Sequence, residues 1–234
     1  MKKICIVIFC VIIHFSCATG TVKNVEKANA HYQLGVSYLN ENKLQMAYVE
    51  FQKAIELDPD NKDVYQALGI IYLNFDDLQR AKDSFLKAVN LDPNFSEAYN
   101  NLGVTYGKMG KWSEAINSFK SALKNPLYRT PENAYGNLGN AYYRLGRIDD
   151  AIDNYKEALK RSPDYYRSYY GLALCYNIKG QYGDASNAFT KAVELDPLFG
   201  GDMEKAFRFF DNKRLTAKGE EAKDILDYLE IMRY

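Results

Sequence analysis

The sequence predicts an all-α fold in which helix-turn-helix units stack into a right-handed solenoid. The first observation is a period of 34 residues, which separates Leu34, Leu68 and Leu102. The second is that small and aromatic residues recur at fixed places within each period. The third is a proline that closes four of the units, at Pro59, Pro93, Pro163 and Pro197. A fixed period of this length is the signature of a helical repeat array.

Each recurring position has a physical role in the predicted helix pairs. Small residues follow the first-helix leucine, and these are Gly35, Gly69, Gly103, Gly139 and Ala173. They allow close approach of neighbouring helices, because a larger side chain would push the helix axes apart. Aromatic rings fill the remaining volume, each contributing about 1.5 to 3 kcal/mol of burial, and these are Phe51, Phe85, Phe119, Tyr155 and Phe189. The pattern resembles the tetratricopeptide repeat, a helix-turn-helix unit of the same period.

The repeat pattern predicts five clear units and a terminal helix pair. The five units cover residues 28–61, 62–95, 96–129, 132–165 and 166–199. Two further apolar stretches at helical spacing follow them, one around Phe207 and one around Leu226. The terminal repeat of such an array is atypical because one of its faces meets water. We therefore expect residues 200–234 to form a degenerate sixth repeat or a capping helix pair.

The first residues have the layout of an export signal. Residues 1–16 contain two lysines and then an apolar run, as a secretory signal peptide does. A small residue directly precedes Cys17, as in the lipobox of bacterial lipoproteins, which predicts that Cys17 carries a lipid. The alternative is cleavage after Ala18 or Gly20 without a lipid. By either route the chain is exported, and residues 17–27 form a short linker before the repeats.

The composition disfavours several function classes. The 30 basic and 30 acidic side chains balance, so charge gives no reason to expect nucleic acid as a partner. Catalysis has little support, because His31 is the one histidine beyond the signal and no catalytic triad, phosphate loop or metal-spaced cluster occurs. Cys175 is the one cysteine left in the folded body, where we expect it to be packed in the core. The sequence therefore predicts a non-catalytic protein without a metal, a cofactor or a small-molecule substrate.

A candidate binding surface follows from the positions of residues within the first helix of each unit. In this repeat family the first helices line a concave face on which peptide ligands lie. Amide and tyrosine side chains gather there, and these are Asn100, Asn101, Asn137, Asn140, Tyr143 and Tyr170. A primary amide donates and accepts hydrogen bonds at once, which suits pairing with the backbone of an extended peptide. The alternative is that Asn101 and Asn137 simply occupy a common consensus position on a helix surface.

An insertion of two residues interrupts the period between the third and fourth units, in the stretch NPLYRTPENAYGNLG from residue 125 to residue 139. Two prolines bracket it, so the preceding helix must end early, and Thr130 followed by Pro131 predicts an N-cap and a first helical residue. The predicted result is a stiff elbow that exposes Leu127, Tyr128 and Arg129. Repeat arrays also tolerate such insertions without any functional reason.

The lipoprotein-like leader, about six tetratricopeptide units and the Asn-Pro-Leu-Tyr elbow together resemble the bacterial type IV pilus biogenesis and stability lipoproteins. This is the pilotin family called PilF, PilW or Tgl. The resemblance implies a protein-binding scaffold, anchored by its lipid to the periplasmic side of the outer membrane, that assists secretin localisation and assembly. It implies secretin or another pilus component as the partner. The alternative is another periplasmic or envelope tetratricopeptide adaptor that scaffolds a different complex.

Overall fold

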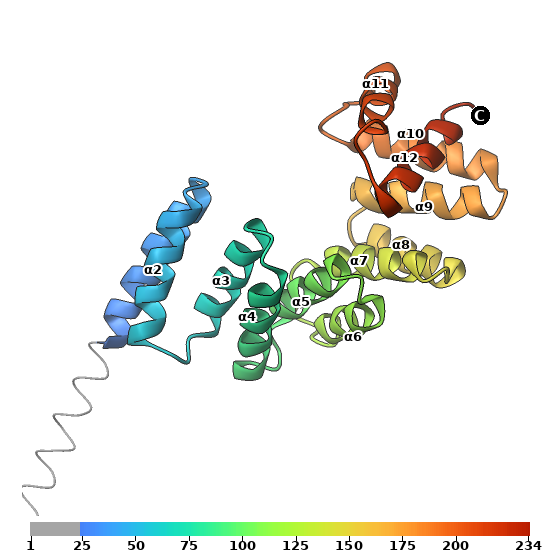
Figure 1. The fold of residues 1–234 in the computed structure, drawn as a ribbon. Helices are drawn as coiled ribbons and strands as arrows, with labels where there is room; N and C mark the ends of the chain where they lie inside the picture. The colour runs from blue at the N-terminus through green and yellow to red at the C-terminus, as the bar shows by residue number, and fades with distance from the viewer. Residues whose placement is uncertain (1–23) are drawn as a thin grey trace, which may run out of the picture. The chain divides into compact units, whose positions relative to one another are not determined.

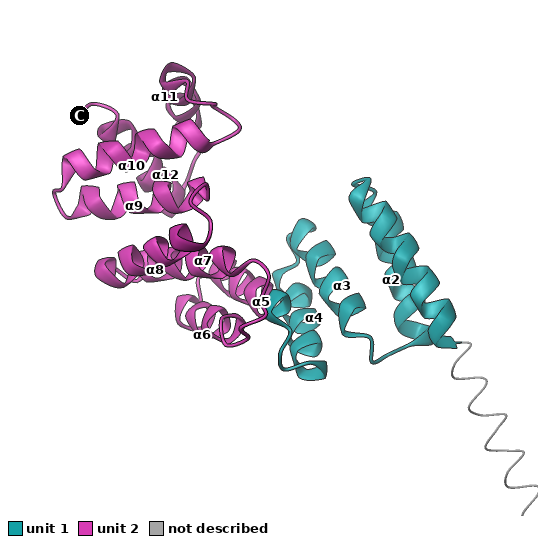
Figure 2. Cartoon of the chain, turned by 180° about the vertical axis from the view of Figure 1, so that it is seen from behind, with its two compact units in different colours: residues 1–98 teal, residues 99–234 magenta. Residues whose placement is uncertain are grey.

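The computed structural model describes residues 24–234, and every regular element in this range is an α-helix (Figure 1). The predicted all-α class is therefore confirmed. The signal peptide and Cys17 lie outside the described residues. The chain divides after Ala98 into two compact units, unit 1 and unit 2, and the division falls within α5 (Figure 2).

Unit 1 consists of consecutive antiparallel helices. A helix covers residues 24–40 and is followed by α2 (Leu44–Leu57), α3 (Lys62–Asn74), α4 (Leu78–Leu91) and the start of α5 (Ser96–Lys108). The side chain of Asn61 caps α3 by accepting hydrogen bonds from the backbone N–H groups of Asp63 and Val64. His31 is partly buried, and its Nδ1 lies within hydrogen-bond distance, 2.6 Å, of Oε2 of Glu50.

Unit 2 continues the same pattern of paired helices and contains more of them. Its elements after α5 are α6 (Trp112–Ala122), α7 (Pro131–Arg144), α8 (Ile148–Arg161), α9 (Tyr166–Ile178), α10 (Tyr182–Leu195), α11 (Met203–Lys213) and α12 (Gly219–Ile231). The pairs α7 with α8 and α9 with α10 have the most extensive contacts, and α12 packs against α9, α10 and α11. The end of the chain thus forms a helix pair that covers α9 and α10.

In several helix pairs, an aromatic ring from the second helix packs directly against the backbone of a glycine in the first helix. A Cβ atom placed on Gly35, Gly69 or Gly103 would lie 2.5 Å from a ring carbon. Real Cβ atoms do not approach a carbon so closely, so only glycine lets the ring lie directly on the helix backbone. The rings concerned are those of Phe51, Phe85 and Phe119, which are all buried. The spacing role predicted for these small residues is confirmed.

Tyr155 extends this arrangement across two helices of unit 2. Its ring, which is only 4% exposed, meets the backbone of Gly139 on α7 and that of Gly171 on α9. A Cβ on Gly139 would lie 2.8 Å from the ring, and one on Gly171 would lie 2.1 Å from it. The same ring therefore sets the separation of α7 and α9 as well as that of α7 and α8.

The elbow before α7 is a short, pinned turn. The helix before it, α6, has 11 residues where α8 and α10 have 14, and α7 begins at Pro131 as predicted. Thr130 occupies the N-cap position, but its side chain makes no capping hydrogen bond. The Oδ1 atom of Asn125 accepts a hydrogen bond of 3.0 Å from the backbone N–H of Leu127, which closes the turn.

The expectation that all three elbow side chains are exposed is wrong for Tyr128. Leu127 is 83% exposed and Arg129 is exposed, but Tyr128 is only 8% exposed. The ring of Tyr128 packs against Ala122 and Ala134 and thereby fills the gap that the shortened α6 leaves. Burial of this ring holds the elbow against the helices that it joins.

Cys175 is buried in the core of unit 2, as the sequence predicts. Its side chain is inaccessible, and burial raises the pKa of its thiol to about 12. The thiolate that reactive cysteines need is therefore disfavoured at neutral pH. Cys175 serves as a small apolar side chain in the packing of α9.

We expect Gly171→Ala to destabilise unit 2 by about 1–3 kcal/mol, because the new methyl group must displace the buried ring of Tyr155. Gly183→Ala is the matched control. Gly183 lies in α10 with nothing within 4 Å of its Cβ position, so the change should raise helix stability by up to about 1 kcal/mol. Urea unfolding followed by circular dichroism compares the two. Equal stability of the two variants would contradict the packing described for Tyr155.

We expect Tyr128→Ala to cost about 3 kcal/mol of unfolding free energy, because it empties the space between Ala122 and Ala134. Leu127→Ala, one position away, should stay within about 0.5 kcal/mol of the original chain, because Leu127 is solvent-exposed. Thermal unfolding of both variants measures the difference. A similar loss for both would show that the elbow is held by something other than the Tyr128 ring.

Candidate functional site

The candidate site lies on the face of unit 2 that the first helices of its repeats form. Asn137 and Asn140, which are half-buried on α7, line two pockets at once. One pocket, named here the polar pocket, has a volume of about 200 Å³ and extends over α9. The other, the apolar pocket, has a volume of about 600 Å³ and extends over α5. Side chains from α12 border both of them.

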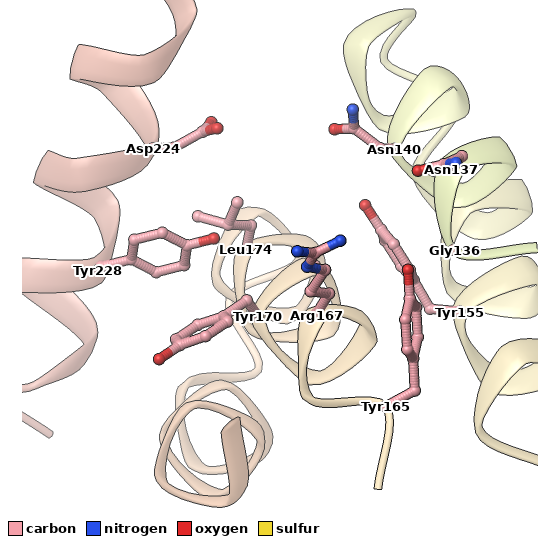
Figure 3. Close-up of a pocket in the computed structure, with 11 residues that line it drawn as sticks. Gly136, Asn137, Asn140, Tyr155, Tyr165, Arg167, Tyr170, Leu174, Asp224 and Tyr228 are labelled. Carbon is pink, nitrogen blue, oxygen red and sulfur yellow. The ribbon is translucent and has the colours of Figure 1, made fainter. Parts of the chain in front are cut away.

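The predicted amide cluster is only partly formed. Asn137 donates a hydrogen bond of 3.0 Å from Nδ2 to Oδ1 of Asn100, which joins α7 to α5. The amide of Asn140 has no hydrogen-bond partner among residues 24–234 and faces the polar pocket (Figure 3). Asn101 lines neither pocket, and its carbonyl accepts a bond from the Thr105 hydroxyl. The structure therefore joins Asn100 to Asn137 and places Asn137 and Asn140 at both pockets, whereas Asn100 and Asn101 line neither pocket.

Four helices supply the walls of the polar pocket, and Figure 3 shows how their side chains converge. The guanidinium of Arg167, on α9, lies between the rings of Tyr228 and Tyr155 in this view. Asp224 and Asn140 point toward each other across the opening. The principal polar groups are Asn137 and Asn140 from α7, Tyr155 from α8, Tyr165 and Arg167 at the start of α9, and Asp224 and Tyr228 from α12.

Asp224 already has cationic and hydroxyl partners. Its Oδ1 accepts hydrogen bonds of 2.9 Å from Nη1 of Arg144 and 3.2 Å from the Tyr143 hydroxyl. Its other oxygen pairs with Nη2 of the same arginine. Both ion-pair partners are largely buried, with side-chain exposures of 15% for Arg144 and 13% for Asp224. The negative charge of Asp224 is thus matched within the fold.

Tyr143 and Tyr170 have structural partners rather than open hydroxyls. Tyr143 is 7% exposed, and burial followed by the nearby charge of Asp224 raises the pKa of its phenol. The Tyr170 hydroxyl donates a 3.2 Å hydrogen bond to Asp196 and points away from the polar pocket (Figure 3). The ring of Tyr170 packs against Tyr228 at a centroid distance of 5.5 Å. The terminal helix α12 therefore occupies the surface where these tyrosines were expected to meet a peptide.

The apolar pocket has a floor of aromatic rings that two glycines leave uncovered. Gly103 and Gly107 lie one turn apart on α5, and Phe119 and Trp112 of α6 lie behind them. A Cβ on Gly107 would lie 2.8 Å from the indole ring of Trp112. Val104 completes the apolar wall, while the amides of α7 form the polar side. The pocket thus offers apolar contact surface beside hydrogen-bonding groups.

Charged residues stand at the rim of the apolar pocket. Lys108 is exposed and has no ion-pair partner within the described part of the chain. Glu220 lies 3.5 Å from Nε of Arg144, and Glu221 lies 2.7 Å from Nζ of Lys213. Both carboxylates come from the first turn of α12, so the terminal helix places negative charge on this side of the site.

Sequence reasoning did not single out Arg167, Gly107 or Trp112 as site residues. Gly107 carried a usable signal, because Leu39, Leu73 and Tyr143 stand at the corresponding position of other units. Asp224 and Tyr228 had no such signal, since they belong to a segment without repeat periodicity whose packing the pattern does not specify.

Two absences apply to residues 24–234. None of the helices described there is long and apolar enough to span a lipid bilayer. The same residues contain no group of three or more histidine, cysteine, aspartate or glutamate side chains arranged to hold a metal ion.

Comparison with solved structures finds the same fold in several proteins. PilW, described as a widely conserved type IV pilus biogenesis factor, is 24% identical, with coverage of 85% of this chain and 98% of its own and a TM-score of 0.67. PilF of Pseudomonas aeruginosa is 20% identical, with coverage of 87% and 98% and a TM-score of 0.67. MamA is 28% identical, with coverage of 69% and 94% and a TM-score of 0.61. The likeness to PilW and PilF establishes a shared fold.

Family models identify the repeats directly from the sequence. No curated protein matches the chain significantly. Models of the tetratricopeptide repeat match residues 28–61, 50–83, 84–117 and 137–198, and these ranges together cover more than half of the chain. The chain therefore belongs to the tetratricopeptide repeat family, whose members are scaffolds for protein binding.

Proposed function

We propose that this chain is an exported, lipid-anchored scaffold that binds a component of the type IV pilus machinery, with secretin as the first candidate. The observation that carries the binding role is the pair of pockets on unit 2 that Asn137 and Asn140 share. Asn140 has no hydrogen-bond partner among the described residues, and its half-buried amide is available to a ligand. Such a group favours a partner that supplies backbone donors and acceptors.

The pilus assignment is supported by features along the whole chain. The leader ends in a lipobox-like cysteine, and the elbow has the Asn-Pro-Leu-Tyr sequence of the resembling family. The fold likeness to PilW and PilF extends over 98% of each of those chains. A tetratricopeptide adaptor of a different envelope complex would have the array and the pockets, but it would not require the elbow.

A lipid at Cys17 would hold the first repeat close to the membrane. Helical structure is present from residue 24, which follows Cys17 by seven positions. The helix thus begins inside the predicted linker of residues 17–27, and an extended chain spans at most about 3.3–3.6 Å per residue, so the seven positions from Cys17 to residue 24 span no more than roughly 25 Å. Unit 1 would therefore remain next to the membrane, and it would present the array to partners that must reach the same bilayer.

We expect Cys17→Ser to move the protein from the outer membrane to the soluble periplasm, because the change removes the acylated side chain. Fractionation of the native host combined with intact mass measures this. The original chain should have the mass of a polypeptide starting at Cys17 with its lipid attached. A lipid-free mass starting at Thr19 or Thr21 would exclude the anchor.

We expect the double change Asn137→Ala and Asn140→Ala to abolish capture of secretin from solubilised outer membranes, since both pockets lose their shared polar edge. Asn101→Ala is the matched control, because it removes a predicted amide that lines neither pocket and should leave capture intact. Immunoblotting against secretin reads the result, and circular dichroism checks the fold of each variant. Capture that survives the double change would show that the pockets are not the secretin site.

A further inference from the structure

The two pockets differ in chemistry although they share one edge. Asn137 and Asn140 lie on α7, the polar pocket opens on the side of α9, and the apolar pocket opens on the side of α5. A ligand backbone that pairs with these amides therefore has one pocket on each side of it. Successive side chains of an extended chain point in opposite directions. Neighbouring residues of one extended segment would then enter different pockets.

The polar pocket carries an uncompensated positive charge. Arg167 makes no ion pair within the described part of the chain, and its guanidinium lies in the pocket (Figure 3). The acidic group of the pocket, Asp224, is already paired with Arg144. The tyrosines beside Arg167 are neutral, because burial raises the pKa of Tyr155, Tyr165 and Tyr228 above the ordinary phenol value. The local field and the hydroxyl donors both favour a carboxylate.

The size of the polar pocket limits the kind of ligand group that can bring a carboxylate to Arg167. A volume of about 200 Å³ is below the range of small-molecule sites and suits one short side chain. Because the same backbone must also continue along Asn137 and Asn140 to the other pocket, the acid is a side chain rather than a chain terminus. Aspartate and glutamate are the residues that meet this requirement.

The apolar pocket suits a bulky aliphatic or aromatic side chain. Its volume is about 600 Å³, and its floor consists of the rings of Trp112 and Phe119, uncovered by Gly103 and Gly107. Its rim carries Glu220 and Glu221, which pair with Arg144 and Lys213, together with Lys108. The large aromatic floor therefore directs the bulky apolar side chain toward Trp112, and the small pocket that contains Arg167 takes the acidic one.

We infer that unit 2 recognises an extended segment of a partner protein in which a bulky apolar residue and an acidic residue are adjacent. The apolar side chain covers Trp112, the acidic side chain pairs with Arg167, and the backbone bonds to Asn137 and Asn140. The inference rests on the binding role proposed for this site, and it specifies the chemistry of the ligand.

The experiment uses Trp112 as the reporter, because it is the single tryptophan of the chain and lines the apolar pocket. The full chain with Cys17→Ser is titrated with the tryptophan-free peptide acetyl-Thr-Val-Phe-Glu-Val-Thr-amide. Three control peptides replace Phe by Ala, replace Glu by Gln, or insert Thr between Phe and Glu. We expect saturable change of the Trp112 emission with the first peptide, and affinity reduced about tenfold or more by each control.

Variants of the protein separate the acid contact from general electrostatics. Arg167→Gln should remove the preference for Glu over Gln, and Arg167→Glu should favour a peptide with Lys in place of Glu. Arg208→Gln, which removes an exposed arginine of α11 that lines neither pocket, should keep the original preference. Circular dichroism confirms that each variant is folded.

Three outcomes overturn the inference: no change of emission with the first peptide at about millimolar concentration, equal affinity for the Glu and Gln peptides, or a preference that survives Arg167→Gln. None of these results depends on export, on the lipid or on secretin. Failure of the pilus assignment appears instead in fractionation and secretin capture. The two proposals can therefore fail separately.

Discussion

The contact of an aromatic ring with a glycine backbone is the constraint on which the rest of this structure depends. At Gly35, Gly69 and Gly103 a Cβ would lie 2.5 Å from the ring, so the helices of these pairs stand at a separation that no other residue permits. Tyr155 applies the same constraint twice, against Gly139 and Gly171. Because this ring touches α7 and α9, the geometry within one repeat also determines the geometry between repeats.

The same contacts create the candidate site. Tyr155, which rests on Gly171, lines the polar pocket, and Phe119, which rests on Gly103, lines the apolar pocket. A larger residue at either glycine would separate the helices and also cover the ring. The pockets therefore arise from the packing of the repeats. Side chains such as Arg167 and Asn140 then give the pockets their specific polar groups. This explains how a stable repeat framework can carry a binding site without a separate loop structure.

The sequence predicted the features that depend on the repeat period. It missed the side-chain contacts that depend on neighbours which the period does not specify. The repeating leucines and glycines located the helix pairs, and Pro131 located the start of α7. The burial of Tyr128 could not be read from the pattern, because it depends on the gap left by the short α6. Tyr143 was expected to face a ligand, but Asp224 of the non-repeating α12 accepts its hydrogen bond. Register within a repeat specifies the helix face of a residue, whereas it does not specify which later segment covers that face.

The terminal helix α12 makes the two sides of the site chemically different. A row of similar repeats offers a groove whose two sides have much the same chemistry, but α12 adds Asp224 on one side and Glu220 and Glu221 on the other. The pairing of Asp224 with Arg144 is decisive, because an unpaired carboxylate in the polar pocket would neutralise Arg167. Since both members of this pair are largely buried, loss of either would leave an uncompensated charge beside the site. The anion preference of the polar pocket therefore follows from an ion pair whose cation lies outside it.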